Sequence, residues 1–526
     1  MAVPTEAAVR ESGRYRPPAV TGLVDLLDHQ VRSRPRARAL VAGADRVELS
    51  YRALAALADD VAQRLAATGL HRGDAVALLC ANTAEFVVGL LGAARAGLVV
   101  APVDPALPAS QLAARLDALG AQAILVGHPS AEGTAGLPAW PLRVDLSRAG
   151  TATVSLDTGA RVTREVRSAA QELSRQDAVV LFTAGTTDRA KMVPLTHGNL
   201  AASVRNICTT YELGPGDATV AVMPFFHGHG LLAALLSSLA SGGCVLLPAR
   251  GRFSARTFWD DVRAVAATWF TAVPTIHEIL LDRSAQDYPG ARAAPLKFVR
   301  SCSAPLNPAT QRALERTFGA PLLSAYGITE ATHQVTSEPL PQHGLLKHGT
   351  VGRATGVRLR VVDGAGRPCP VGTEGEVWVQ GPTVTRGYLA NPAEMAGSYG
   401  EGWFRTGDLG TLDEDGYLFL TGRIKNLINR GGEKISPEHV EDILAGCPGV
   451  VEAAVFAVPD SVYGQRVGAA VVVRDGENLG PEQILHYCRH RLSAFEVPGS
   501  LEVVGSLPHT AKGGLDRRAV EAAYVR

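Results

Sequence analysis

The chain has 526 residues, too many for one hydrophobic core, so we expect two or more domains. Hydrophobic residues make up 46% of it and charged residues 19%, as in an ordinary globular protein. Lys+Arg and Asp+Glu are both 51, and this balance excludes the strongly basic class of nucleic-acid-binding proteins.

The seven cysteines are scattered without a CxxC pair, which predicts reduced thiols and neither a disulfide framework nor a zinc site. The first twenty residues lack the apolar core of a signal peptide, and no apolar stretch reaches the length of a membrane span. We therefore expect a cytoplasmic monomer or homodimer with no nucleic acid and no membrane as partner.

Helical and strand patterns alternate along the first part of the chain. Leu54, Leu57 and Val61 recur at helical spacing, and a helix is expected from Ala84 to Ala96. The short apolar runs GDAVALLC, GLVVAPVDP and AQAILVG predict strands. This alternation indicates α/β layers around a largely parallel sheet. Residues 150–176 are polar and weakly patterned, and we expect them to form a surface connection.

A strand-like run, AVVLF, ends at Phe182 and leads into a loop of small and hydroxylic residues. Gly185 permits backbone angles by which amide groups can turn toward an anion. Hydroxyl donors and a mobile positive charge are added by Thr183, Thr186, Thr187 and Lys191. The stretch predicts a phosphate-binding loop, with a polar hairpin as the open alternative. It does not match the GxxxxGK[ST] loop.

Unusual polar residues follow several further predicted strands, and ligands collect at the carboxyl ends of strands in open α/β sheets. These strand ends lie after Phe182, Pro224, Arg300 and Ala325. In PFFHGHG, His227 and His229 flank a glycine, and a pocket-lining role is favoured because no third metal ligand accompanies them.

The pattern changes from Gly349 onward. TVGRATGVRLRVVD, GEVWVQGP and GYLFLTG alternate as antiparallel strands do, with turns at Asp363-Gly364 and Asp415-Gly416. Ser436-Pro437-Glu438 has the chemistry of a helix start, with Ser as cap and Pro at the first position. The last hundred or so residues are expected to form a compact α+β unit.

Five segments occur in one order: TAGTT…K, YGITE, GEVWVQGP…GY, GWFRTGDLG and GRIKNLINRGGEKI. In them, and over nearly its whole length, the chain resembles the adenylate-forming superfamily of acyl-CoA synthetases, peptide-synthetase adenylation domains and luciferases. The resemblance implies an α/β fold with a large N-terminal domain of layered α/β subdomains plus a small β-barrel-like subdomain (1–422). A hinge (423–426) and a mobile α+β C-terminal lid domain (427–526) would follow.

The implied reaction joins an acid to ATP with release of pyrophosphate, and then passes the acyl group to CoA after the lid rotates. The loop from Thr183 to Lys191 would hold the β- and γ-phosphates, Thr329 would reach the α-phosphate, and Glu330 would bind Mg²⁺. The implied adenosine-binding residues are Ser303, Ala304, Pro305, Tyr326, Gly327 and Asp408, with Arg423 beside Asp408 and Lys425 at the hinge. The implied catalytic residues are Lys191, Thr329, Glu330, Arg423 and Lys512.

Two segments depart from the superfamily's pattern. The phosphate loop is normally TSGTTGxPKG, and here Asp188 replaces a glycine, which places a carboxylate near the triphosphate. Near the C-terminus, LPHTAKGGLDRR stands where relatives carry a segment like LPKTASGKIQRR. Gly514 then takes the position of the final lysine, and Lys512 lies two residues earlier.

The pocket segments PFFHGHG, RSCSAPL and EATHQ resemble those of the oxalate–CoA ligase branch. His229, Ser301 and His333 fall where that branch binds oxalate, and imidazoles and a hydroxyl suit a small polar anion. The alternative is that these side chains only cap strand ends and close off a tunnel. The expected activity is therefore a small-acid–CoA ligase.

Two further functions remain open. One is an ATP-dependent diazotase that adenylates nitrite and transfers it to a small-molecule amine, since nitrite is also a small anion. The other is a catalytically impaired AMP-binding homologue, which Gly514 and the altered phosphate loop favour.

Overall fold

The computed structural model of the protein describes residues 15–127, 136–146, 152–159, 162, 172–183, 190–474, 476–477, 479–510 and 514–525. The described residues group into two compact units. The first runs as far as Phe253 and includes Ala264–Ala267 and Thr332–Gln334. The second comprises Ser254–Arg263, Thr268–Ala331 and the chain from Val335 onward.

The larger sheet of the first unit has the strand order β7-β6-β5-β3-β4-β8-β9. Its inner neighbours pair in parallel, and the edge pairs β6–β7 and β8–β9 are antiparallel. The strands are β3 Ala75–Leu79, β4 Val99–Val103, β5 Ala123–Val126, β6 Ala139–Leu146, β7 Ala152–Leu156, β8 Asp177–Thr183 and β9 Lys191–Thr196. The predicted α/β layering around a largely parallel sheet is confirmed.

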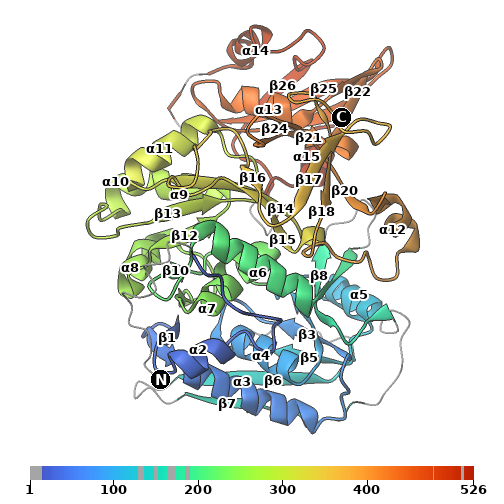
Figure 1. The fold of residues 1–526 in the computed structure, drawn as a ribbon. Helices are drawn as coiled ribbons and strands as arrows, with labels where there is room; N and C mark the ends of the chain where they lie inside the picture. Colours follow the sequence, from blue (N-terminus) through green and yellow to red (C-terminus); the bar gives the residue numbers. More distant parts are fainter. Residues whose placement is uncertain are drawn as a thin grey trace. The chain divides into compact units, whose positions relative to one another are not determined.

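Helices α3 (Tyr51–Ala66), α4 (Ala84–Arg95) and α5 (Ala109–Leu119) accompany this sheet (Figure 1). The α3 helix begins where the Ser50 side chain accepts a hydrogen bond from the Ala53 amide, and it buries the leucines and valine of the predicted stripe. It packs on α4, which packs in turn on β3 and β4. The helix expected from residue 84 is confirmed.

The strand β7 corrects one expectation. It lies in the stretch that was predicted to be a surface connection, and it pairs antiparallel with β6. Val154 and Leu156 are buried between exposed neighbours, so the side chains alternate as in a strand. Only two buried apolar residues carry this alternation, which is why it was not recognised among the polar residues.

A smaller sheet of the first unit has the order β10-β11-β1-β2. Here β10 (Ala218–Val220), β11 (Cys244–Leu246) and β1 (Arg38–Ala42) are parallel, and β2 (Val47–Ser50) is antiparallel to β1. The helices of this part are α2 Asp28–Ser33, α6 His197–Tyr211, the π-helix η2 His229–Leu236 and α7 Ser237–Ser241.

Most of the sheet β12-β13-β14-β15-β16 belongs to the second unit, but the first two residues of β15, His333 and Gln334, belong to the first unit. Its strands are β12 Trp269–Ala272, β13 Phe298–Ser301, β14 Leu322–Ile328, β15 His333–Ser337 and β16 Arg353–Ala354. The accompanying helices are α8 Ala255–Val265, α9 Pro274–Asp282, α10 Ser284–Asp287, α11 Pro308–Phe318 and the short 3₁₀ helix η3 Thr329–Ala331.

An antiparallel sheet of order β17-β18-β20-β19, with β21 on β20, follows in the same unit. Its elements are β17 Arg358–Val362, β18 Gly375–Gln380, α12 Pro392–Ser398, β19 Tyr399–Gly400, β20 Trp403–Leu412, β21 Leu418–Arg423 and the 3₁₀ helix η4 Ile424–Asn426. The predicted change to antiparallel strands after Gly349, with turns at residues 363–364 and 415–416, is confirmed.

The C-terminal elements are β22 Ile428–Arg430, β23 Glu433–Ile435, α13 Pro437–Ala445, β24 Val450–Asp460, β25 Gly464–Val473, α14 Pro481–Arg489, β26 Ser500–Val504 and α15 Arg517–Tyr524. The predicted α+β composition and the Ser436 cap of α13, which accepts from the His439 amide, are confirmed. The boundaries at residues 422 and 427 and the mobility of a lid stay predictions.

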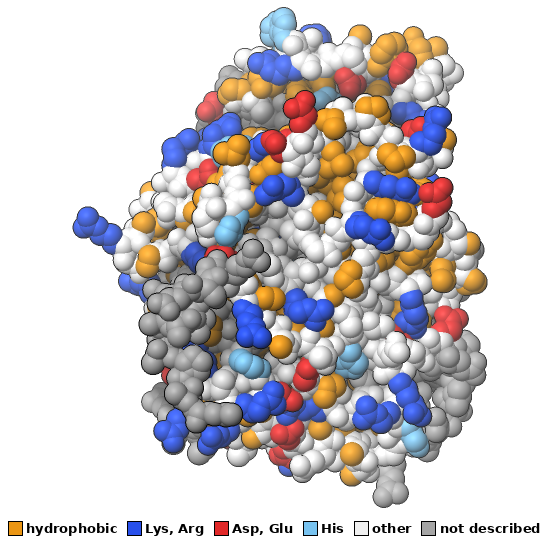
Figure 2. All heavy atoms as spheres, in the orientation of Figure 1, with side chains coloured by type: hydrophobic (Ala, Val, Ile, Leu, Met, Phe, Trp, Pro, Cys, Tyr) orange, Lys and Arg blue, Asp and Glu red, His pale blue; other side chains and the backbone are white. Residues whose placement is uncertain are grey.

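Charged side chains of both signs are interspersed on the face drawn in Figure 2, in keeping with the zero formal net charge. Among the described helices, none combines the length and apolar character that a bilayer crossing needs.

Candidate functional site

The predicted phosphate loop joins β8 to β9 in the first unit. The two strands are antiparallel, and Thr183, the last residue of β8, lies directly opposite Lys191, the first residue of β9. The loop's entry threonine and exit lysine are therefore neighbours across the hairpin. The other loop residues named above, Gly185, Thr186, Thr187 and Asp188, lie outside the described residues.

Two histidines predicted to bind the acid lie together in the first unit. The rings of His229 and His333 stack with centroids 5.2 Å apart and planes 21° apart. Both residues are buried, with 4% and 6% of their surface exposed. His227 is more exposed, and its ring packs edge-on against Phe226 instead. The structure thus selects His229 from the HGH motif as the partner of His333.

The backbone around both imidazoles is unusual. His229 is the first residue of the π-helix η2, a rare element that is frequent at functional sites. Thr332 and His333 both have left-handed backbone angles, with φ of 52° and 79°. Consecutive left-handed residues other than glycine are costly and persist only where neighbours hold them.

Helix α6 supplies those neighbours. The Ser203 hydroxyl donates to the Thr332 carbonyl oxygen at 2.6 Å, and the Tyr211 hydroxyl donates to Gln334 Oε1 at 3.1 Å. All of these groups are buried. The left-handed segment that presents His333 is therefore fixed to α6 on both sides.

A close backbone approach fixes the other imidazole. A Cβ atom on Gly230 would lie 2.3 Å from the Pro224 carbonyl oxygen and 2.4 Å from that of Met223. Only glycine fits there without a shift of the main chain. The PFFHGHG turn therefore needs this glycine to place His229 at the start of η2.

In the second unit, Tyr326, Asp408 and Arg423 form one hydrogen-bonded cluster. Asp408 lies opposite Arg423 in the β20–β21 pair, and Arg423 Nε is 2.5 Å from Asp408 Oδ1. The Tyr326 hydroxyl donates to Asp408 Oδ2. The adjacency of Arg423 to Asp408 that the resemblance implies is thus present in the structure.

The electrostatics of this cluster follow from burial. Asp408 is 2% exposed, and burial raises the pKa of its carboxyl, while Arg423 and the Tyr326 hydroxyl act in the opposite direction. The Asp408 charge raises the pKa of Arg423. Each carboxylate oxygen has two acceptor positions, so Asp408 retains capacity for further donors such as a diol. The Tyr326 ring itself packs in a hydrophobic cluster.

Glu330 is oriented by a tyrosine that the sequence interpretation did not name. The Tyr388 hydroxyl donates to Glu330 Oε1 at 2.8 Å, and the Thr385 amide donates to the Glu330 carbonyl oxygen at 2.7 Å. Burial, and next the Glu330 charge, raise the pKa of Tyr388. Tyr388 is the last residue of the GEVWVQGP…GY segment, so the sequence motif contains it but does not indicate its contact with Glu330. Thr329 precedes Glu330 in η3.

The remaining predicted residues of the second unit lie at or near the ends of neighbouring strands. Ser301 ends β13, is 2% exposed, and its Oγ has no hydrogen-bond partner among the described residues. Ser303, Ala304 and Pro305 follow it, and Ser303 has a left-handed φ of 77°. Gly327 lies near the end of β14, beside Tyr326.

Lys425 is exposed in η4, and its charge acts on Asp408 to lower the pKa of that carboxyl. Lys512 lies outside the described residues. Gly514 is described, and its carbonyl oxygen accepts a hydrogen bond from the Thr510 amide at 2.8 Å.

Family models match most of the chain. The model of the AMP-binding enzyme matches residues 27–389, and that of the AMP-binding enzyme C-terminal domain matches residues 439–513. The chain belongs to the family of AMP-binding enzymes. The predictions of an adenylate-forming fold and of an AMP-forming, acid–thiol type of ligase are therefore confirmed.

Individual relatives of this AMP-binding enzyme agree. An oxalate–CoA ligase of Arabidopsis thaliana is 43% identical over 96% of this chain and 98% of its own. An oxalate–CoA ligase of Saccharomyces cerevisiae is 38% identical over 87% of this chain and 88% of its own. The crystal structure of ATP-bound MatB from Rhodopseudomonas palustris matches with a TM-score of 0.83 and 29% identity, over 96% of this chain and 99% of that one.

Proposed function

We propose that this AMP-binding enzyme activates a small polar acid with ATP, releases pyrophosphate, and transfers the acyl group to CoA, with an oxalate-like dicarboxylate as the acid. The observation that carries the proposal is the buried, stacked pair of His229 and His333 in a chain similar to oxalate–CoA ligases.

The histidine pair suits a small anion on energetic grounds. An imidazole N–H that meets a carboxylate makes a charge-assisted hydrogen bond of roughly 1.5–3 kcal/mol. A long apolar acid would offer these imidazoles no hydrogen bond, and sites built for polar partners reject apolar analogues strongly. The unpaired hydroxyl of Ser301 adds a donor suited to the same acid.

ATP binding is assigned to the predicted residues. Thr183 and Lys191, at the two ends of the β8–β9 hairpin, would hold phosphate oxygens with the loop between them. Asp408 would accept hydrogen bonds from the ribose, and its pairing with Arg423 and Tyr326 keeps the carboxylate oriented. Thr329 would donate to the α-phosphate, where the acid's oxygen attacks and pyrophosphate leaves.

Glu330 fits the binding of Mg²⁺. One of its oxygens accepts from Tyr388, and among the described residues the other has no hydrogen-bond or ion-pair partner. The described residues hold no cluster of three or more metal-binding side chains. Mg²⁺ commonly takes one or two carboxylates together with waters and substrate phosphates, so one glutamate is sufficient. The ion would offset charge on the triphosphate.

The second half-reaction is assigned to the C-terminal part. We propose residues 427–526 as a lid that rotates about a hinge at 423–426, which contains Lys425. Lys512 would take the role of the superfamily's final lysine, whose position Gly514 occupies. The acyl group then passes from the adenylate to the thiol of CoA, and AMP leaves. The relatives described above lend no support to nitrite or an amine as substrates, nor to an impaired homologue.

The test is pyrophosphate release with ATP and Mg²⁺ for oxalate, malonate, a medium-chain acid and nitrite, each with and without CoA. We expect release with oxalate or malonate, a CoA thioester of matching mass, and little turnover of the medium-chain acid. Glu330→Gln serves as the inactive control. Release with nitrite alone, dependent on an added aromatic amine and indifferent to CoA, would contradict the proposal and establish a diazotase.

A further inference from the structure

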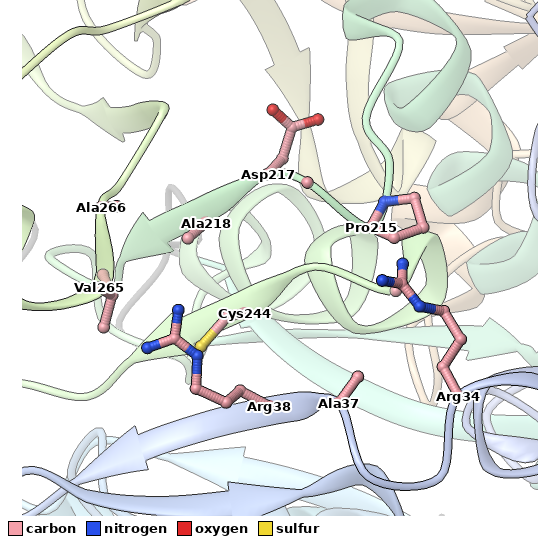
Figure 3. Close-up of a pocket in the computed structure, with 11 residues that line it drawn as sticks. Arg34, Ala37, Arg38, Pro215, Asp217, Ala218, Cys244, Val265 and Ala266 are labelled. Carbon is pink, nitrogen blue, oxygen red and sulfur yellow. The ribbon is translucent and has the colours of Figure 1, made fainter. Parts of the chain in front are cut away.

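A cleft of about 270 Å³ opens in the first unit at the beginning of its smaller sheet (Figure 3). Three lining residues, Arg38, Ala218 and Cys244, are the first residues of the parallel strands β1, β10 and β11. The segment with His227 and His229 follows the other end of β10. The starts and ends of parallel strands lie at opposite edges of a sheet, so this cleft is distinct from the candidate acid-binding residues.

Two arginines give the cleft its charge. In Figure 3 the side chains of Arg34 and Arg38 rise at either side of the space, from the segment that leads into β1. Among the described residues, the Arg34 guanidinium makes no hydrogen bond or ion pair. Arg38 pairs with Glu48 at 3.0 Å, but their side chains are 42% and 56% exposed. Such an exposed pair is weak, and a better partner can displace it.

The other polar groups that line the cleft do little to neutralise the positive charge of the two arginines. Asp217 is the acidic residue of the lining, its Oδ2 accepts from the Gly214 amide at 2.8 Å, and its carboxylate points away from the two arginines (Figure 3). Burial raises the pKa of Cys244 to about 11, so its thiol stays neutral near pH 7. Ala37, Pro215 and Val265 line the remainder with apolar surface.

We propose that this cleft is a second ligand site, which binds a small molecule through a phosphate or carboxylate group held between Arg34 and Arg38. The planar guanidinium group can bind either a carboxylate or a phosphate through two parallel N–H···O hydrogen bonds. The uncharged part of the ligand lies against Pro215 and Ala218. The site is independent of the acid and nucleotide of the proposed reaction.

The experiment is calorimetric titration of the full-length chain with inorganic phosphate and, separately, with malonate, each in the presence of a saturating non-hydrolysable ATP analogue. We expect one equivalent of phosphate to bind, and two of malonate, because malonate also enters the proposed acid site. The variants are compared by the equivalent bound in the cleft. Arg34→Ala or Arg38→Ala should weaken this binding about tenfold or more, as loss of one charged contact does. Arg36→Ala is the matched control, because Arg36 is an exposed arginine of the same segment that does not line the cleft.

A space-filling variant separates the cleft from general charge. Gly216 lines the cleft and a Cβ atom there would meet nothing within 4 Å, so Gly216→Phe is chosen to introduce a bulky side chain at this position. This variant should abolish phosphate binding and leave malonate with the one equivalent of the proposed acid site, although both arginines are intact. Tighter binding of phosphate than of malonate in the cleft would identify the ligand as a phosphate compound. Tighter binding of malonate would identify it as a carboxylate. The proposal would be overturned if phosphate fails to bind and malonate binds no more than one equivalent at millimolar concentration, or if Arg34→Ala and Arg36→Ala bind in the cleft equally well.

Discussion

Replacement of Tyr388 by phenylalanine tests whether Glu330 has the metal-binding role proposed for it. The substitution removes one hydroxyl, which donates to Glu330 Oε1 at 2.8 Å, and leaves the ring in place. A hydrogen bond to a charged group contributes about 1.5–3 kcal/mol. Glu330 is only half-buried, so water can replace part of the contact. We therefore expect the lower end, about 1.5 kcal/mol, or roughly a tenfold effect.

The assay is pyrophosphate release at saturating ATP and acid over a series of Mg²⁺ concentrations. Because Tyr388 orients the carboxylate and does not itself bind the metal, Tyr388→Phe should raise the Mg²⁺ concentration for half-maximal rate about tenfold. Excess Mg²⁺ should restore most of the rate. Glu330→Gln should lose turnover at every Mg²⁺ concentration while its unfolding temperature stays close to that of the parent.

The control is Tyr417→Phe, which removes a hydroxyl that donates to the Leu345 carbonyl oxygen at 2.6 Å. It deletes the same chemical group from the same unit without touching a carboxylate. An unchanged Mg²⁺ dependence in Tyr388→Phe, or an equal change in Tyr417→Phe, would refute the positioning role.

Three more predictions concern the histidines and one glycine. His333→Ala should raise KM for the small acid about tenfold, by loss of a charged hydrogen bond, whereas His227→Ala should have little effect in the same kinetic assay. Burial lowers the pKa of His277 from 6.5 to about 4. The contribution of the neutral imidazole to the free energy of unfolding is therefore fully present above pH 6.5, and it is lost as the pH falls toward 4. At about pH 5 the parent should have lost roughly 2 kcal/mol of this contribution, and His277→Gln should not show the loss. Denaturant unfolding of both proteins at two pH values measures the difference. Gly230→Ala should lower stability by about 2–4 kcal/mol because of its clash with main-chain oxygens, while Gly214→Ala, which meets no atom within 4 Å, should change it by less than about 0.5 kcal/mol.

Regular spacing of apolar residues and local capping signals were sufficient to predict the main helices and strands of the fold. The leucine stripe of α3 is buried as predicted, and the Ser-Pro-Glu start of α13 is capped by Ser436 as expected. These elements are set by local chemistry, by helical periodicity and by one side chain that satisfies an open amide. The strand β7 was missed because its buried side chains are few and polar residues stand between them.

The sequence suggested a set of candidate site residues but not the contacts among them, and their roles stay predictions. The resemblance placed Asp408 and Arg423 near each other, and a two-strand register brings them into contact. The hydrogen bond from Tyr388 to Glu330 joins residues 58 positions apart, and no local pattern encodes such a distance. The stacking of His229 on His333 depends likewise on tertiary packing, so the sequence suggested both histidines without showing that they touch.

The histidine pair is also where the chain departs most from ordinary backbone preferences, and this departure bears on its function. Thr332 and His333 are left-handed without being glycine, and His229 begins a π-helix. Each feature costs free energy, of the order of 1–3 kcal/mol for a strained residue, and simple packing of a core offers no reason to keep both. Hydrogen bonds from Ser203 and Tyr211 hold the strained segment in place. The structure holds two imidazoles 5.2 Å apart and nearly enclosed in spite of this cost. That cost favours the proposed small anionic ligand over the closing of a tunnel, for which any bulky apolar side chain would serve.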